Sequence, residues 1–146
     1  MDLGTLLKLV ELFRGLSDTQ RERIMGIGQE QIYQAGDVVV AQGSEGDEMF
    51  IIGSGQVEVQ IEASGGVTHS AIYLGEGQIF GEMALIDRGK RSASVVVIEN
   101  DTTIFRLPAD QFTGLCMADT AIGYIMMRNL AQDLSFKLRY QNLLNN

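Results

Sequence analysis

Apolar residues near the N-terminus recur at the spacing of an α-helix, and the middle of the chain follows a shorter period. Five apolar positions within residues 5–13 predict an amphipathic helix with a polar outer face: Leu6, Leu7, Leu9, Val10 and Phe13. Ser17 and Gln20 then have the spacing of a capping box. Two helices are therefore predicted before the first strand, the second reaching Met25.

Glycine-rich turns separate short apolar or alternating runs from residue 28 to residue 107. Of the 17 glycines, 11 lie between Gly36 and Gly89, a density that is typical of short strands joined by tight turns. The runs predict eight strands, at Gln31–Tyr33, Val38–Ala41, Met49–Ile52, Val57–Ile61, Ser70–Leu74, Gln78–Phe80, Ser94–Ile98 and Thr102–Leu107.

A helical pattern returns after Pro108, the only proline of the chain. A brief helical segment leads to Asp119 or Thr120, either of which suits the N-cap of a last helix. The apolar stripe of that helix consists of Ile122, Ile125, Met126, Leu130, Leu134 and Leu138, and Leu143 extends it. Two interpretations of the stripe are open, namely packing against the strands or a seam between two copies of the chain.

The order of elements predicts an α+β fold that is mainly β. We expect an eight-stranded antiparallel jelly-roll barrel flanked by N-terminal helices and a long C-terminal helix, because closing the sheets removes most exposed strand edges. The length of 146 residues fits one domain. Its expected parts are helices at 1–27, the barrel at 28–107 and C-terminal helices at 108–144.

The charge balance bears on the classes of partner. The chain has 19 Asp plus Glu against 11 Lys plus Arg, a formal net charge of −8. Contacts to nucleic-acid phosphates need clustered cations, so no direct nucleic acid binding is expected. Between Arg23 and Arg106 the only basic residues are Arg88, Lys90 and Arg91, which places the positive charge of this stretch at one point.

The single cysteine and the single histidine leave little for metal or triad chemistry. Cys116 has no intramolecular disulfide partner and is expected to be buried, in a reducing, cytoplasmic setting. His69 alone cannot form a multi-histidine metal site, and we interpret it as an exposed strand end. We therefore expect no catalytic residue, no metal and no cofactor. The chain also lacks an apolar run long enough for membrane insertion.

Residues 80–94 form a segment that is longer than a turn needs. Gly81 permits a tight exit from a strand, and Glu82–Ile86 suits one helical turn, whose free N–H groups favour an anion. Arg91 is able to donate two hydrogen bonds to anionic oxygens, and Ser92 adds a hydroxyl. Each such charge-assisted hydrogen bond is worth about 1.5–3 kcal/mol, so Arg91 is expected to decide affinity.

Glu82 would repel an anion held by this segment unless it accepts a hydrogen bond from a neighbouring hydroxyl. A ribose hydroxyl is the natural donor, by the logic that places a carboxylate on the ribose in dinucleotide sites. Phosphate donors and a ribose acceptor nine residues apart predict a nucleotide pocket. Arg88 and Lys90 are interpreted as solvated charges that raise the association rate rather than as contacts.

The same segment resembles the phosphate-binding cassette of cyclic nucleotide-binding domains. These domains occur in bacterial catabolite-activator-type regulators, cyclic-nucleotide-gated channels and cyclic-nucleotide-dependent kinase regulatory subunits. The resemblance covers roughly residues 10–140 and is specific because several motifs agree in order and spacing. The matching motifs are Phe80–Ile86, Arg91–Val95, Gly36-Asp37, Gln42–Asp47 and Gly55.

This resemblance implies a role for the cassette residues. Glu82 would accept a hydrogen bond from the ribose 2′-hydroxyl, and Arg91 would pair with the exocyclic phosphate oxygens. The backbone N–H groups that would line the phosphate are those of Gly81, Ala84 and Ser92. The full set of expected ligand-binding residues is Gly81, Glu82, Met83, Ala84, Arg91, Ser92 and Ala93.

The resemblance further implies that the last helix acts as a lid over the base. Arg139 or Tyr140 would supply the covering contact by stacking. In kinase regulatory domains an acidic residue steadies the cassette arginine, and Gly53 stands at that place here. The hydroxyl of Ser92 is compatible with either cAMP or cGMP.

The sequence thus predicts a non-enzymatic sensor of a cyclic nucleotide, with cAMP favoured and cGMP as the other candidate. Ligand binding is expected to reorder the C-terminal helix and to signal to a protein partner or an output domain, with a homodimer through that helix as a further interpretation. One alternative is a degenerate domain that acts as a protein-interaction module. The other is a cupin-like enzyme, which would need two or three histidines on adjacent strands.

Overall fold

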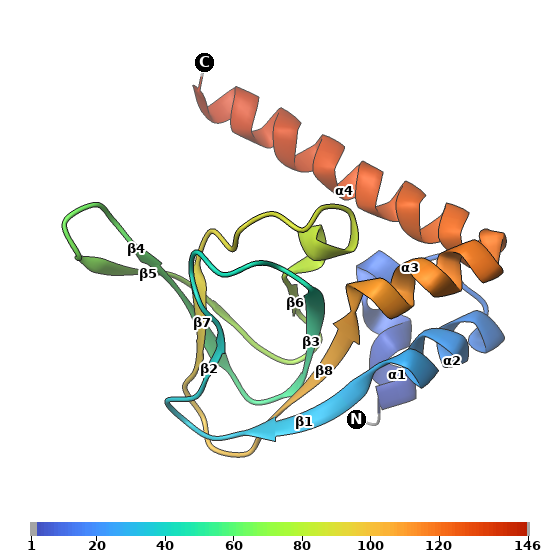
Figure 1. The fold of residues 1–146 in the computed structure, drawn as a ribbon, viewed down its shortest axis with the longest axis horizontal. Helices are drawn as coiled ribbons and strands as arrows, with labels where there is room; N and C mark the ends of the chain where they lie inside the picture. Colours follow the sequence, from blue (N-terminus) through green and yellow to red (C-terminus); the bar gives the residue numbers. More distant parts are fainter. Residues whose placement is uncertain (1–2, 146) are drawn as a thin grey trace.

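The computed structural model describes residues 3–145, and it describes the side chains at these positions except at 3, 71 and 141–145. Figure 1 shows the helices gathered on one side of the strands, with the last helix crossing above them. The elements are α1 (Leu3–Leu9), the 3-10 helix η1 (Glu11–Phe13), α2 (Asp18–Ile27), β1 (Gln29–Tyr33), β2 (Val38–Val40), β3 (Glu48–Ser54), β4 (Val57–Glu62), β5 (Thr68–Leu74), β6 (Ile79–Phe80), the 3-10 helix η2 (Glu82–Leu85), β7 (Ser94–Val97), β8 (Thr102–Pro108), α3 (Ala109–Ala118) and α4 (Thr120–Asn145).

The strands form two four-stranded sheets, in the orders β1-β8-β3-β6 and β2-β7-β4-β5, and all their pairings are antiparallel. Each predicted strand run overlaps an observed strand. The predicted closed barrel is wrong, because no ladder joins the two sheets within residues 3–145. The sheets instead face each other in a double-sheet arrangement of the jelly-roll kind. Edge strands β2 and β6 have only three and two residues, so one edge of each sheet is short. The opposite edges, β5 and β1, have seven and five residues.

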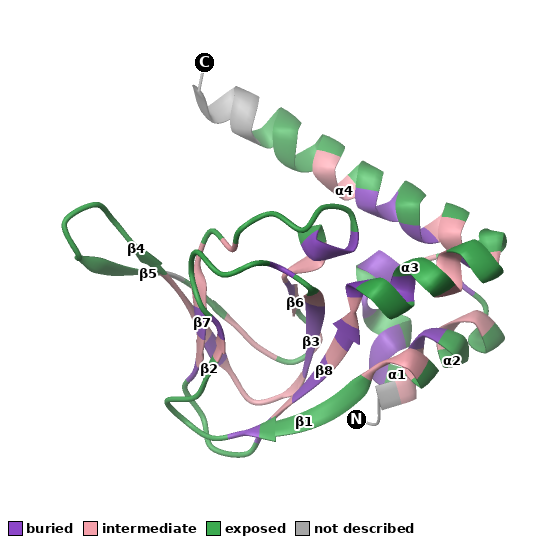
Figure 2. Cartoon of the chain, viewed as in Figure 1, coloured by how far each residue is buried: buried purple, intermediate pink, exposed green. Residues whose placement is uncertain are grey.

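Strand β3 is buried on both faces, and its unbroken apolar run reflects this position. Met49 and Ile51 belong to a core cluster built with the helices, whereas Phe50 and Ile52 belong to a second cluster between the two sheets. The first sheet is therefore the middle of three layers. Figure 2 shows the buried residues concentrated along β3, β8 and the helix surfaces that face them.

The predicted first helix is interrupted at Val10, whose backbone is extended at φ −73° and ψ 118°. This break separates α1 from η1 and turns Leu12 and Phe13 into the core, where they are 1% and 2% exposed. The predicted capping box is confirmed. The Ser17 hydroxyl accepts the Gln20 N–H at 3.2 Å, and the Gln20 side chain accepts the Ser17 N–H at 2.8 Å.

The last helix packs against the body of the protein along its first half only. Its stripe is buried at Ile122, Met126 and Leu130 but is 59% exposed at Leu138, so the packing interpretation fails at that position. The side chain of Leu143 lies outside the described ones. Asp119 accepts the Ile122 N–H at 3.3 Å and caps the helix. In the part of the chain that the structure describes, no helix is long and apolar enough to cross a bilayer.

Candidate functional site

A cavity of about 450 Å³ lies between the second sheet and the segment that follows β6. This volume falls within the range of about 300–1,000 Å³ that is usual for small-molecule sites. All seven predicted ligand-binding residues line it, and so do the apolar side chains of Val40, Val59 and Val95. Sequence reasoning missed these three valines; alternation was an available signal along β4 (VEVQIE) alone, because β2 (VVV) and β7 (SVVV) are apolar at consecutive positions.

The backbone of the cassette is fixed by the loop that precedes β3. Three hydrogen bonds join the two segments: Gly43 N–H to the Arg91 carbonyl at 2.8 Å, Arg91 N–H to the Ser44 carbonyl at 2.7 Å, and Gly46 N–H to the Gly89 carbonyl at 3.0 Å. Two of these bonds hold the backbone of Arg91, one at its N–H and one at its carbonyl. The run at 42–47 therefore fixes the backbone position from which the side chain of Arg91 extends.

Backbone carbonyls hold the guanidinium of Arg91 at one end of the cavity. Its Nη2 donates to the Glu48 carbonyl at 2.6 Å and its Nη1 to the Gly81 carbonyl at 3.4 Å. The Arg91 Cζ atom lies 5.7 Å from the centre of the Phe50 ring, within the range of a cation–π contact. Among the described residues no carboxylate lies within ion-pair distance of Arg91.

The electrostatics of Arg91 follow from this placement. Partial burial lowers the pKa of the guanidinium, and the nearby carboxylates of Asp47, Glu48 and Glu82 oppose that effect by raising the pKa. A guanidinium has five N–H donors. The carbonyls of Glu48 and Gly81 accept hydrogen bonds from only some of them. The remaining donors are suited to an anion that replaces the lost hydration.

Two glycines leave the space that Arg91 occupies. Gly81 has φ +74°, and a Cβ atom at that position would lie 2.6 Å from Arg91 Nη1. A Cβ atom at Gly46 would lie 3.2 Å from Arg91 Nε. Gly81 is therefore required both by its left-handed backbone and by the approach of the guanidinium.

Glu48 connects this end of the site to β8. Its carboxylate accepts two hydrogen bonds from Arg106, at 2.6 Å from Nη2 and 3.1 Å from Nε. The hydrogen bond to Glu48 raises the pKa of Arg106. Gly53 stands where the resemblance places an acidic residue. A Cβ atom at this position would lie 2.8 Å from Oγ1 of Thr103 on β8. In this structure a backbone carbonyl, that of Glu48, rather than a side-chain carboxylate accepts a hydrogen bond from the Arg91 guanidinium.

The backbone N–H groups of the cassette differ in whether they already donate a hydrogen bond within the protein. The predicted helical turn is a 3-10 helix of four residues, and within it the Ala84 N–H already donates to the Gly81 carbonyl at 3.1 Å. The N–H groups of Gly81 and Ser92 have no acceptor among the described residues. Only two of the three predicted phosphate-binding N–H groups are therefore free in this geometry.

Glu82 lines the cavity and is engaged by α4. Its Oε1 lies 2.6 Å from the Nζ of Lys137, and the Glu82 side chain is 16% exposed. Sequence reasoning missed Lys137, because nothing in the local pattern of α4 marks it. Arg139 and Tyr140, the predicted lid contacts, are exposed and do not line the cavity, so their contact with a base stays a prediction.

The three clustered cations have different surroundings. Arg88 forms an ion pair with Asp110 of α3 and does not line the cavity, whereas Lys90 and Asp87 do. Lys90 is thus closer to the site than the sequence predicted. Only Arg91 combines partial burial with a place in the cavity wall.

The remaining reactive side chains lie outside the cavity. His69 is exposed on β5, as predicted. Cys116 is half-buried in α3 rather than fully buried, and burial, followed by the charge of Asp119, raises the pKa of its thiol. Across residues 3–145 the structure brings no three His, Cys, Asp or Glu side chains together as a set of metal ligands.

Comparison with known proteins identifies the family. The model of the cyclic nucleotide-binding domain matches residues 30–119, which include β1 to β8 almost completely and the whole cassette. This chain belongs to the cyclic nucleotide-binding domain family. The match places the cavity and its cassette inside the region that defines these domains.

Relatives of this cyclic nucleotide-binding domain differ in the nucleotide that their names give. The cyclic AMP receptor protein of Thermus thermophilus is 32% identical over 132 residues, which are 90% of this chain and 59% of that protein. A cGMP-dependent protein kinase of Caenorhabditis elegans is 29% identical over 111 residues, 75% of this chain and 14% of the kinase. The crystal structure of Thermus thermophilus catabolite activator protein has a TM-score of 0.80 at 32% identity, covering 91% of this chain and 60% of that chain. The chain therefore spans about three fifths of the length of the Thermus thermophilus protein, and 14% of the kinase.

Proposed function

We propose that residues 1–146 form one regulatory domain that binds a single cyclic nucleotide in the cavity beside the cassette. Arg91 pairs with the exocyclic phosphate oxygens, and Glu82 accepts a hydrogen bond from the ribose hydroxyl. The observation that carries the proposal is the state of Arg91, which is half-buried, lines the cavity and has donors to spare, being held by two backbone carbonyls and the Phe50 ring and by no carboxylate of the described residues. Family membership supports the same ligand class.

We propose cAMP as the favoured ligand. The relative named as a cyclic AMP receptor protein matches 90% of this chain, and the cGMP-dependent kinase matches 75%. Ser92 lines the cavity, and its hydroxyl is compatible with both bases. Titration with cAMP and with cGMP measures this preference directly, as the difference between the two affinities.

The proposed output is a change in α4. This helix contacts the cassette through Lys137 and Glu82, while Tyr124 and Leu138 are exposed on it at 67% and 59%. Reordering of α4 upon binding would change what this surface presents to a protein partner, an output domain or a second copy of the chain. Light scattering with and without cAMP tests the second-copy interpretation.

Isothermal titration with cAMP, cGMP and 5′-AMP tests the proposal. We expect a cyclic nucleotide to bind with a Kd well below 1 mM, and 5′-AMP to bind more weakly because its phosphate has a different shape and charge. If neither cyclic nucleotide binds below millimolar concentration and none raises the melting temperature, the domain is a degenerate one and the proposal is wrong. A saturating ligand at 100 times its Kd stabilises a true binder by about 2.7 kcal/mol.

A matched pair of variants assigns the role to Arg91. Arg91→Ala removes two charge-assisted hydrogen bonds to phosphate, and at about 1.5–3 kcal/mol for each bond the affinity falls by a factor of about one hundred or more. Arg88→Ala removes a neighbouring cation that does not line the cavity, and we expect little change. Circular dichroism of both variants verifies that the fold is retained, and equal losses of affinity would contradict the assignment.

A further inference from the structure

The carboxylate that faces the cavity is bound by the last helix. Lys137 Nζ lies 2.6 Å from Glu82 Oε1, across 55 positions of sequence, and the two side chains are 59% and 16% exposed. In the part of the chain that the structure describes, this is the hydrogen bond that links α4 to residues 80–94. The pair therefore joins the element that would contact ligand to the element that would respond.

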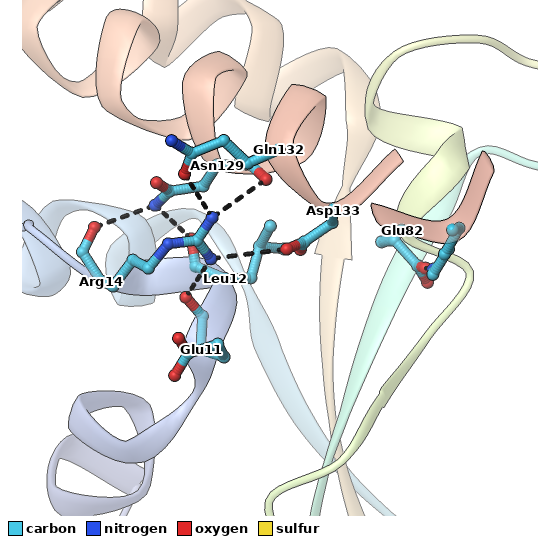
Figure 3. Close-up of polar contacts among 8 residues, drawn as sticks. Glu11, Leu12, Arg14, Glu82, Asn129, Gln132 and Asp133 are labelled. Carbon is cyan, nitrogen blue, oxygen red and sulfur yellow. Dashed lines mark hydrogen bonds and ion pairs between the residues drawn. The ribbon is translucent and has the colours of Figure 1, made fainter. Parts of the chain in front are cut away.

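The inner half of α4 is attached independently of this pair. Asn129 is buried and donates to the carbonyls of Leu12 and Arg14 at 2.7 and 2.9 Å. Arg14 in turn donates to Gln132 Oε1 at 2.7 Å and lies 3.5 Å from an Asp133 carboxylate oxygen, as Figure 3 shows. These contacts fix α4 to the segment before α2 as far as its fourth turn.

The outer half of α4 has no such attachment. Every described side chain from residue 135 to residue 140 is exposed, including Phe136 at 71% and Tyr140 at 57%. Within this described stretch the ion pair of Lys137 with Glu82 is the polar contact to the rest of the protein. Apart from the continuity of the helix itself, one polar side-chain pair therefore positions the outer half in this described stretch.

The chemistry of the pair is compatible with simultaneous ligand binding. A carboxylate has two oxygens with about four acceptor positions, and Lys137 uses Oε1 while Oε2 has no described partner. A ribose hydroxyl is therefore able to donate to Oε2 while the ammonium stays in place. The ammonium also offsets the negative charge of Glu82, which would otherwise repel a phosphate held by Arg91.

We propose that Lys137 is a positioning residue that couples ligand binding to the docking of α4, by holding the carboxylate of Glu82 toward the ribose. This inference rests on the proposed function and adds to it the residue through which the helix responds. Because coupling is reciprocal, bound nucleotide strengthens the docking of residues 135–145, and the docked helix strengthens nucleotide binding by the same factor.

Titration calorimetry on four proteins tests the coupling: the wild type, Lys137→Met, Lys137→Arg and Lys8→Met. Lys8 is a matched control because it is 56% exposed, pairs with Asp18 and lies away from the cavity. We expect Lys137→Met to weaken cAMP binding about two- to fivefold, the range of a partly exposed ion pair. Lys137→Arg restores the affinity, and Lys8→Met leaves it unchanged.

Hydrogen exchange of residues 134–145 supplies a readout that affinity alone does not. In the wild type, cAMP slows exchange in this stretch, and in Lys137→Met the slowing is lost although exchange in β3 is unchanged. Combining Lys137→Met with Glu82→Gln should give no further loss of affinity beyond Glu82→Gln alone, because the two residues act through one contact.

The outcomes separate the two proposals. If the wild type binds neither cAMP nor cGMP, the proposed function fails and the coupling fails with it. If the wild type binds and Lys137→Met binds equally well, the proposed function stands and the coupling is refuted. Tighter binding by Lys137→Met would also refute it, because the lysine would then compete with the ribose for Glu82.

Discussion

Replacement of Gly81 by alanine should reduce nucleotide affinity far more than its effect on stability suggests. Gly81 has φ +74°, and an added Cβ would lie 2.6 Å from Arg91 Nη1 and 3.1 Å from the Glu48 carbonyl oxygen. Placing alanine in a left-handed conformation costs about 1–2 kcal/mol of folding free energy. The crowding adds a second effect, on affinity, because the Arg91 guanidinium is the group that moves away from the added Cβ atom.

The size of that second effect follows from the distances. An ordinary contact needs about 3.5 Å, so the guanidinium must withdraw by about 1 Å. The hydrogen bond from Arg91 Nη1 to the Gly81 carbonyl is already 3.4 Å long and does not survive such a shift. If the displaced arginine loses one charge-assisted hydrogen bond to phosphate, about 1.5–3 kcal/mol, affinity falls about tenfold to a hundredfold.

Gly36→Ala is the matched control for Gly81→Ala. Gly36 has φ +93°, and no atom lies within 4 Å of the Cβ that alanine would add. Urea unfolding should therefore show a loss of stability in both variants, the larger one in Gly81→Ala, and calorimetric titration with cAMP should show a loss of affinity in Gly81→Ala alone. Equal affinities would refute the argument that Gly81 makes room for the cassette arginine.

Two further predictions concern stability and reactivity. Asn129→Ala leaves the carbonyls of Leu12 and Arg14 without their donor, and the free energy of unfolding in urea should fall by about 2–4 kcal/mol; a loss below 1 kcal/mol would show that water replaces the amide. The pKa of the Cys116 thiol is raised in the folded chain, so above the ordinary thiol pKa the folded chain still holds a proton that the unfolded chain has released. The contribution of this thiol to the free energy of unfolding is therefore complete at neutral pH and is lost as the pH rises above the ordinary thiol pKa. Its reaction with a thiol reagent at pH 8 should accelerate upon denaturation, and equal rates in the folded and unfolded protein would contradict the burial effect.

The sequence predicted the elements well where period and turn chemistry are local signals. Strand runs, the capping box at Ser17 and the cassette at 80–94 all depend on neighbours within a few residues. Sheet closure and the break at Val10 could not be predicted in the same way. Both depend on which surfaces the strands and helices finally cover, and that is a property of the whole chain.

The site shows the same division between local and distant information. The seven residues predicted to bind ligand lie on one short segment, and they all line the cavity. The groups that hold this segment come from elsewhere: the carbonyl of Glu48, the ring of Phe50 and the ammonium of Lys137. A backbone carbonyl leaves no mark in a sequence, and a single lysine on a polar helix face is not distinguished from its neighbours.

The contacts of Asn129, Gln132 and Asp133 attach the inner part of α4, so a reorientation of its outer part would turn about Asp133. Lys137 lies four residues beyond Asp133 and Asn145 lies 12 residues beyond it, which correspond to about 6 Å and about 18 Å of a straight helix. If the outer part turns as a rigid body, a displacement at Lys137 would be about three times larger at the end of α4. Under the proposed coupling, a shift of about 1 Å at Lys137 would therefore move the end of the helix by about 3 Å.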